Sequence, residues 1–175
     1  MSPAQLRALS APRATVVPAA LASFLAITGA TALCDLATKA WAVHALGGRE
    51  LPVVPGLSLR LVFNTASAGG VWIGEHTWAI NALATLLAVL LTGVAVLPLA
   101  RIDRLAPLTL GLIAGGATGN LASLIGGPAG VADFLAFGYR GGAVILNVAD
   151  VAVVVGLGLL VRSIVRVGGA IRQQG

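Results

Sequence analysis

Residues 145–161 read ILNVADVAVVVGLGLLV, and this stretch decides what kind of protein the chain forms. It is long and apolar enough to cross a membrane, yet Asn147 and Asp150 stand near its start. A charged side chain at the centre of a bilayer costs at least about 2.5–3.5 kcal/mol. A carboxylate kept in a membrane span at this cost is a candidate functional group, and the rest of the sequence should explain it.

The composition of the whole chain indicates an integral membrane protein. Of its 175 residues, 58% are hydrophobic and only 10% are charged, which is too little charge for an ordinary water-soluble domain. Four apolar stretches are long enough to cross a bilayer, at about 15–34, 77–98, 105–126 and 143–161. None alternates with the period of two that is typical of a membrane β-barrel. We therefore predict a single all-α domain with four transmembrane helices.

The first stretch has one alternative interpretation, as a cleaved signal peptide. Basic residues precede it, and Ala30-Thr31-Ala32 has the A-x-A form of a cleavage site. Its apolar run is longer than the usual 7–15 residues of a signal peptide, so we interpret it as a retained span.

The arginines predict the orientation of the chain. They gather before the first span, in the short loop between the second and third, and after the fourth (Arg7, Arg13, Arg101, Arg104, Arg162, Arg166 and Arg172). Alternating helices place these segments on one side of the membrane, and the positive-inside rule makes that side cytoplasmic. We expect cytoplasmic tails at 1–14 and 162–175, and extracytoplasmic loops at 46–76 and 127–142.

Polar side chains gather at the outer membrane surface in this topology. Asn120 lies near the outer end of the third span, and Asp133 follows in the second outer loop. Asp150 stands about seven residues into the fourth span, with Asn147 one helical turn before it. Asn64, in the first outer loop, can join them. The asparagines could instead be interhelical hydrogen-bonding residues, worth about 0.6 kcal/mol each, and Asp133 could be a solvated loop residue.

Asp35 and Lys39 stand four residues apart at the outer end of the first span. This spacing predicts an ion pair on one helix face, which lowers the cost of placing either charge near lipid. We expect the pair to be structural and interfacial.

Two carboxylates at one site suggest acid–base chemistry by an aspartic dyad. Repulsion between neighbouring carboxyls raises one pKa, so that one can hold a proton while the other is ionised. The sequence has one cysteine and two histidines without an H-E-x-x-H pattern, so we expect no metal and no cofactor.

Five short motifs occur in order: DLATK (35–39), FNTASAGG (63–70), GGATGNL (115–121), GVADF (130–134) and LNVAD (146–150). Together, on four expected spans, they resemble the lipoprotein signal peptidase family, signal peptidase II, the membrane aspartic proteases of bacteria. The resemblance implies removal of the signal peptide from diacylglyceryl-modified prolipoproteins, just before the lipidated cysteine. It implies a monomer in the bacterial cytoplasmic (inner or plasma) membrane, with its active site facing outward and no nucleic-acid partner.

The resemblance also implies roles for individual residues. Asp133 and Asp150 would be the catalytic dyad, while Asn64, Asn120 and Asn147 would shape the site and hold the substrate backbone. The first outer loop would form a small extracytoplasmic sheet on the membrane, and the segment LPVVPGLSLRLVFN (51–64) is β-prone.

Three positions depart from the family pattern. Ser123 and Leu124 stand where the family usually has Asp-Arg, and Gly69 stands where an aromatic residue is usual. Leu124 cannot replace the donors of an arginine. These departures motivate an alternative function, a catalytically weak or silent paralogue that binds lipoproteins or signal helices. A small ion or proton carrier is a weaker alternative, because the chain shows no repeated halves.

Overall fold

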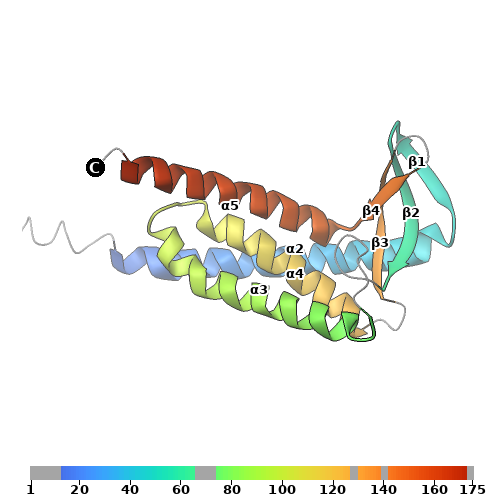
Figure 1. The fold of residues 1–175 in the computed structure, drawn as a ribbon, viewed down its shortest axis with the longest axis horizontal. Coiled ribbons are helices and arrows are strands. Elements are labelled where there is room, and N and C mark those ends of the chain that lie inside the picture. Colours follow the sequence, from blue (N-terminus) through green and yellow to red (C-terminus); the bar gives the residue numbers. More distant parts are fainter. Residues whose placement is uncertain (1–12, 66–73, 127–129, 139–141, 173–175) are drawn as a thin grey trace, which may run out of the picture.

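The computed structural model describes residues 13–65, 74–126, 130–138 and 142–172. Long helices lie side by side along the molecule, and a small sheet stands at one end of them (Figure 1). The helices are α2 (Arg13–Leu46), α3 (Thr77–Ala100), α4 (Ala106–Gly126) and α5 (Val148–Arg172). The strands are β1 (Glu50–Val54), β2 (Leu57–Asn64), β3 (Val131–Gly138) and β4 (Ala143–Leu146).

The predicted membrane architecture is confirmed. Within the described residues, four helices are long and apolar enough to cross a bilayer: Val17–Leu46, Thr77–Ala100, Ala106–Gly126 and Val148–Arg166. Large apolar side chains such as Leu91 and Val94 on α3 are exposed on the outside of the helices. Such a surface suits lipid rather than water.

Two helix boundaries differ from those expected. Helix α2 continues to Leu46, so that Asp35 and Lys39 lie inside it rather than at its end. Helix α5 begins at Val148 and continues to Arg172, past the expected end at Val161. Asp150 therefore lies in the first turn of α5, not seven residues into the helix. The prediction of a helix from residue 143 is wrong because the apolar run 143–146 forms a short strand. Hydrophobicity alone does not distinguish such a strand from the start of a helix.

The sheet has the order β1-β2-β3-β4, and all its neighbouring strands are antiparallel. The β-prone segment 51–64 forms β1 and β2, as the sequence predicts. Strand β3 was expected to be a loop, and it brings Asp133 into the sheet opposite Val62 of β2. The departure at Gly69 and the tail residues 1–12 and 173–175 lie outside the described residues.

Helix α4 is the centre of the bundle. Half of its span is buried, against less than a fifth of each other span. Two of its glycines let the neighbouring helices come close. A Cβ on Gly116 would lie 2.5 Å from the carbonyl oxygen of Ala149, and one on Gly119 would lie 2.5 Å from Asp35 Oδ2. Because both glycines lack a Cβ, α2 and α5 can bring polar groups against α4.

The end of the bundle opposite the sheet is fastened by Asp103, in the loop between α3 and α4 (Figure 1). Its Oδ2 accepts hydrogen bonds from Ser163 Oγ at 2.5 Å and Arg162 Nη1 at 3.3 Å. Its Oδ1 accepts the backbone N–H of Leu105 at 3.0 Å. The Ser163 hydroxyl above all, then the Leu105 N–H, holds the pKa of Asp103 below its usual value. The loop is thereby tied to α5.

We expect Ser163→Ala to lower the free energy of unfolding by about 1.5–3 kcal/mol at neutral pH, the usual contribution of a hydrogen bond to a charged group. Because the pKa of Asp103 is lowered in the folded state, the stabilisation is present above its usual pKa and is lost as pH falls through the lowered value. Denaturation of parent and variant in detergent at several pH values measures this. A difference that stays constant down to strongly acidic pH would contradict it.

Candidate active site

The first turn of α5 is built by Asn147 and Asp150 as a reciprocal cap. Asn147 Oδ1 accepts the backbone N–H of Asp150 at 3.0 Å, and Asp150 Oδ2 accepts the backbone N–H of Asn147 at 3.0 Å. This is the geometry of a capping box, in which two residues satisfy N–H groups that a helix start leaves free. It explains why the helix begins at Val148. It also places a carboxylate at a helix N-terminus, where negative charge is favoured.

Asp133 reaches the same point from β3. Its Oδ1 accepts a hydrogen bond from Asn147 Nδ2 at 2.7 Å, and its side chain also bonds Asn64 of β2. Asp133 is only 4% exposed. Burial raises the pKa of Asp133 from 3.8 to about 6, and the nearby Asp150 carboxylate acts in the same direction, while the two asparagines and Lys39 oppose the shift. This carboxyl can therefore hold a proton near neutral pH.

Asn120 of α4 bonds both residues of the α5 cap. Its Nδ2 donates to Asp150 Oδ1 at 2.9 Å, and its Oδ1 accepts a hydrogen bond from Asn147 Nδ2 at 3.0 Å. Asn120 of α4 and Asn147, the residue before α5, thus bond both carboxylates and each other. They form hydrogen bonds between helices, as the alternative interpretation expects, and these bonds also join the two carboxylates in one network.

Asp35 and Lys39 form the predicted ion pair, with 2.6 Å between Lys39 Nζ and Asp35 Oδ2. The pair is buried within the protein, since Asp35 is 0% and Lys39 4% exposed. Asp35 Oδ1 accepts the backbone N–H of Ala149 at 2.9 Å, and Lys39 Nζ donates to Asn120 Oδ1 at 2.7 Å. Both residues therefore belong to the polar network, a connection that the sequence did not indicate.

The seven residues singled out in the sequence therefore meet at one site, at the end of the bundle next to the sheet. Helices α2, α4 and α5 and strands β2 and β3 supply six of them, and Asn147 stands just before α5. Within the part of the chain that the structure describes, no three His, Cys, Asp or Glu residues lie close enough to hold a metal ion. The arrangement offers two neighbouring carboxyls in different environments, which suits proton transfer.

A family model described as Signal peptidase (SPase) II matches residues 27–166, most of the chain. The chain belongs to the signal peptidase II family. Members of this family are aspartic-type membrane proteases, and the resemblance inferred from the five motifs is confirmed. The predicted enzyme class is confirmed with it.

Individual relatives agree with this membership. The lipoprotein signal peptidase of Bifidobacterium longum subsp. infantis is 36% identical over 142 residues, which cover 77% of this chain and 74% of the relative. That of Sulfurihydrogenibium sp. is 31% identical over 147 residues, covering 79% and 88%. A solved bacterial membrane enzyme shares the fold with a TM-score of 0.69, at 20% identity over 82% of this chain and 92% of the other.

The two departures in α4 of this signal peptidase II family member make other hydrogen bonds than those to the two carboxylates. Ser123 Oγ donates to the carbonyl oxygen of Gly119 at 3.1 Å, within its own helix. The backbone carbonyl of Leu124 accepts a hydrogen bond from Trp78 Nε1 of α3 at 3.3 Å. Neither side chain is among the hydrogen-bond donors to the two carboxylates.

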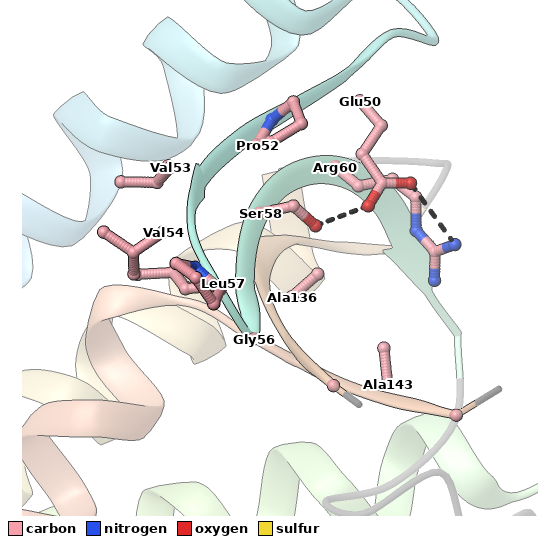
Figure 2. Close-up of a pocket in the computed structure, with 13 residues that line it drawn as sticks. Glu50, Pro52, Val53, Val54, Gly56, Leu57, Ser58, Arg60, Ala136 and Ala143 are labelled. Atoms are coloured by element: carbon pink, nitrogen blue, oxygen red, sulfur yellow. Dashed lines mark hydrogen bonds and ion pairs between the residues drawn. The ribbon is translucent and has the colours of Figure 1, made fainter. Parts of the chain in front are cut away.

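The sheet of this family member carries a separate hollow of about 800 Å³, shown in Figure 2. Ser58 and Arg60 line it together with Glu50, and Glu50 accepts a hydrogen bond from Ser58 Oγ at 2.5 Å. Ala136 of β3 also faces it. Asp133 is three residues away along the strand, so alternation directs its side chain to the opposite face. The hollow is therefore not the space between the carboxyls.

Proposed function

We propose that this protein removes the signal peptide from diacylglyceryl-modified prolipoproteins, cutting just before the lipidated cysteine. The observation that carries the proposal is the pair of carboxyls, Asp133 and Asp150, bridged by Asn147 in a member of the signal peptidase II family. Relatives over about three quarters of the chain are named lipoprotein signal peptidase. The proposed catalytic residues are the same two aspartates.

The two carboxyls suit different roles in a metal-free hydrolysis. Both oxygens of Asp150 accept N–H bonds at the start of α5, which suits an ionised carboxylate. Asp133 is buried and its raised pKa lets it hold a proton. Asp150 would take a proton from water as the water oxygen bonds to the scissile carbonyl carbon, while Asp133 gives its proton to the carbonyl oxygen. The resulting gem-diol then collapses: the C–N bond breaks as Asp150 gives the proton it took from water to the leaving nitrogen, and Asp133 takes back a proton from a gem-diol hydroxyl.

The site is proposed to face the outer side of the membrane, with both chain termini in the cytoplasm. Arg101 and Arg104 follow α3 at the end of the bundle that lies opposite the sheet, and Arg162 and Arg166 are near the same end of α5 (Figure 1). The positive-inside rule supports placing that end in the cytoplasm of a bacterial cell. A substrate anchored by its lipid and signal helix would meet the site at the membrane surface. We propose that the enzyme acts as a monomer.

Activity should depend on pH in a bell-shaped way. Asp133 must be protonated in the proposed mechanism, so the rate should fall as pH rises through its pKa, which is about 6 in the free enzyme. A bound substrate that excludes water should move this limb to higher pH. At low pH the rate should fall again because both carboxyls are then protonated.

The apparent pKa values of this profile belong to the pair of carboxyls and not to either residue alone. Initial rates of signal-peptide release between pH 4 and 9 (roughly the range in which these groups titrate) measure the profile, and a flat profile would contradict the dyad.

The proposal is tested with the purified protein reconstituted in lipid. A diacylglyceryl-modified prolipoprotein is offered beside its unmodified form, and signal-peptide release is followed on a gel. We expect cleavage of the modified substrate, located before the lipidated cysteine by mass spectrometry. A relative named lipoprotein signal peptidase is run in parallel as the positive control. If that relative cuts the substrate and this protein does not, the proposed activity on that substrate is excluded.

The silent-paralogue alternative rests on Ser123 and Leu124, whose side chains bring no donor to the two carboxylates. It requires that the protein bind a lipoprotein or a signal helix without cleaving it. The test measures binding of a prolipoprotein to the parent and to Asp133→Asn. Equal binding by both proteins, with the prolipoprotein left intact by the parent, would support this alternative instead.

A further inference from the structure

Lys39 is the only lysine of the chain, since all the other basic side chains are arginines. It is 4% exposed, on the face of α2 that packs against α4. A lysine ammonium is a compact charge with three donors, whereas the arginine guanidinium is a wide planar fork. A compact donor fits where a single cation must serve several acceptors at short range. Lys39 serves two, Asp35 Oδ2 at 2.6 Å and Asn120 Oδ1 at 2.7 Å.

The hydrogen bond from Lys39 strengthens one of the two possible orientations of the Asn120 amide. The amide oxygen accepts only and the amide nitrogen donates only. Because Lys39 Nζ is a pure donor, it favours the oxygen of Asn120 on the α2 side. The nitrogen is then directed to Asp150 Oδ1, at 2.9 Å. Without Lys39, a flipped amide would still be opposed by the donor Asn147 Nδ2 at 3.0 Å and by the acceptor Asp150 Oδ1 at 2.9 Å, so Lys39 is the third group, and the only charged donor, that favours this orientation.

Asp35 holds the ammonium in place and attaches α2 to α5. It is fully buried, and its Oδ1 caps the backbone N–H of Ala149, next to Asp150. Gly119 provides the room, because a Cβ there would lie 2.5 Å from Asp35 Oδ2. The ion pair therefore reaches both the amide that bonds Asp150 and the helix turn that carries Asp150.

We propose that Lys39 is a positioning residue of the dyad: it orients Asn120 toward Asp150, with Asp35 as its holder, rather than serving only to stabilise the bundle. This inference rests on the proposed function for its kinetic test and on the hydrogen-bond network alone for its second test. The ionisable groups that face the network are Asp35 and Lys39 of α2, Asp133 of β3 and Asp150 of α5.

The kinetic test compares Lys39→Met with the double variant Asp35→Asn/Lys39→Met. The single variant leaves a buried carboxylate without its cation and can unfold. The double variant removes both charges, and an asparagine at position 35 can still accept the N–H of Ala149. We expect it to fold, with kcat lowered about 100-fold, as for a small misplacement of a reacting group, and with KM unchanged within about twofold because Lys39 does not contact substrate.

Two further results decide between positioning and packing. In the same Asp35→Asn background, Lys39→Gln keeps an N–H donor without the charge, so we expect Asp35→Asn/Lys39→Gln to retain at least about tenfold more activity than Asp35→Asn/Lys39→Met. The pH profile of Asp35→Asn/Lys39→Met should shift upward, since the Lys39 charge favours the ionised form of Asp133. A folded Asp35→Asn/Lys39→Met variant with kcat within about threefold of the parent and an unshifted profile would overturn the proposal. Equal loss of activity in the folded Gln and Met variants at position 39, both in the Asp35→Asn background, would also overturn it.

The second test needs no substrate and so separates this inference from the proposed function. Protein labelled with ¹⁵N-lysine gives one side-chain ammonium signal, because the chain has one lysine. We expect this signal to shift as the dyad titrates and the response to become clearly smaller in Asn120→Ser, which removes the connecting amide and leaves only the direct charge interaction between Lys39 and Asp133. A signal that does not respond to dyad titration, or that responds equally in Asn120→Ser, would overturn the proposal even if the parent cleaves its substrate. If the parent does not cleave, the response still supports it.

Discussion

Asp133→Asn and Asp150→Asn should each lower the rate of signal-peptide release by about 10³- to 10⁴-fold, the upper range for loss of a general acid or base. An asparagine at position 133 keeps the size of the side chain but has no proton to give to the scissile carbonyl. At position 150 the same change removes the base that takes the proton from water. The measurement is single-turnover cleavage of a diacylglyceryl-modified prolipoprotein in lipid, near the optimum of the parent.

The controls separate lost chemistry from lost folding. An amide oxygen at position 150 can still accept the backbone N–H of Asn147, so the α5 cap should survive. The free energies of unfolding of both variants should therefore lie within about 1 kcal/mol of that of the parent. Glu75→Gln removes an exposed carboxylate before α3 and should keep full activity. Cleavage at more than about a tenth of the parental rate by either aspartate variant would exclude that aspartate from the proposed dyad.

Asn147→Ala should have the largest combined effect on stability and activity among the asparagines. It removes the cap of α5, worth about 0.5–2 kcal/mol, and the donor to buried Asp133 Oδ1. Loss of that donor raises the pKa of Asp133 further, because the bond from Asn147 lowers it in the parent. We expect a lower unfolding free energy, about 100-fold slower cleavage and an alkaline limb at higher pH. Denaturant titration and the pH profile measure the two effects.

A serine at this position gives the matched control, Asn147→Ser. A serine hydroxyl caps a helix about as well as an asparagine, but it cannot bond Asn120 and Asp133 as the amide does. We therefore expect Asn147→Ser to recover most of the stability lost in Asn147→Ala while remaining slow. If the serine variant recovered activity together with stability, the role of Asn147 would be confined to the cap.

The sequence alone predicted the elements that have strong periodic or compositional signals. The apolar lengths of α3 and α4 located both helices within two residues. The order and spacing of Asn120, Asp133 and Asp150 placed these three residues at one membrane level, and the structure brings them into a single network.

What the sequence did not predict depends on contacts between distant segments. The strands β3 and β4 carry runs of apolar residues without the alternation of a half-buried strand, so the Asp133 segment read as a loop and 143–146 read as helix. The Lys39–Asn120 contact joins residues 81 positions apart, and no local pattern contains it. The same is true of the cap that Asp35 supplies to Ala149, 114 positions away. One sequence signal did mark the start of α5. The N-x-x-D spacing of Asn147 and Asp150 is similar to that of the capping box.

Helix α5 is bonded at two places to carboxylates from elsewhere in the chain, Asp35 at its first turn and Asp103 at Ser163. Between these two places one face of α5 packs on α4 at Gly156, where a Cβ would lie 2.6 Å from Ile113, while Val154, Val155 and Leu157 are exposed. The position of Asp150 is therefore set by the two attachments and by the face that packs on α4, and not by the exposed aliphatic residues. Over evolutionary time these exposed positions can exchange valine, leucine and isoleucine as the host's lipids change, while the dyad keeps its geometry.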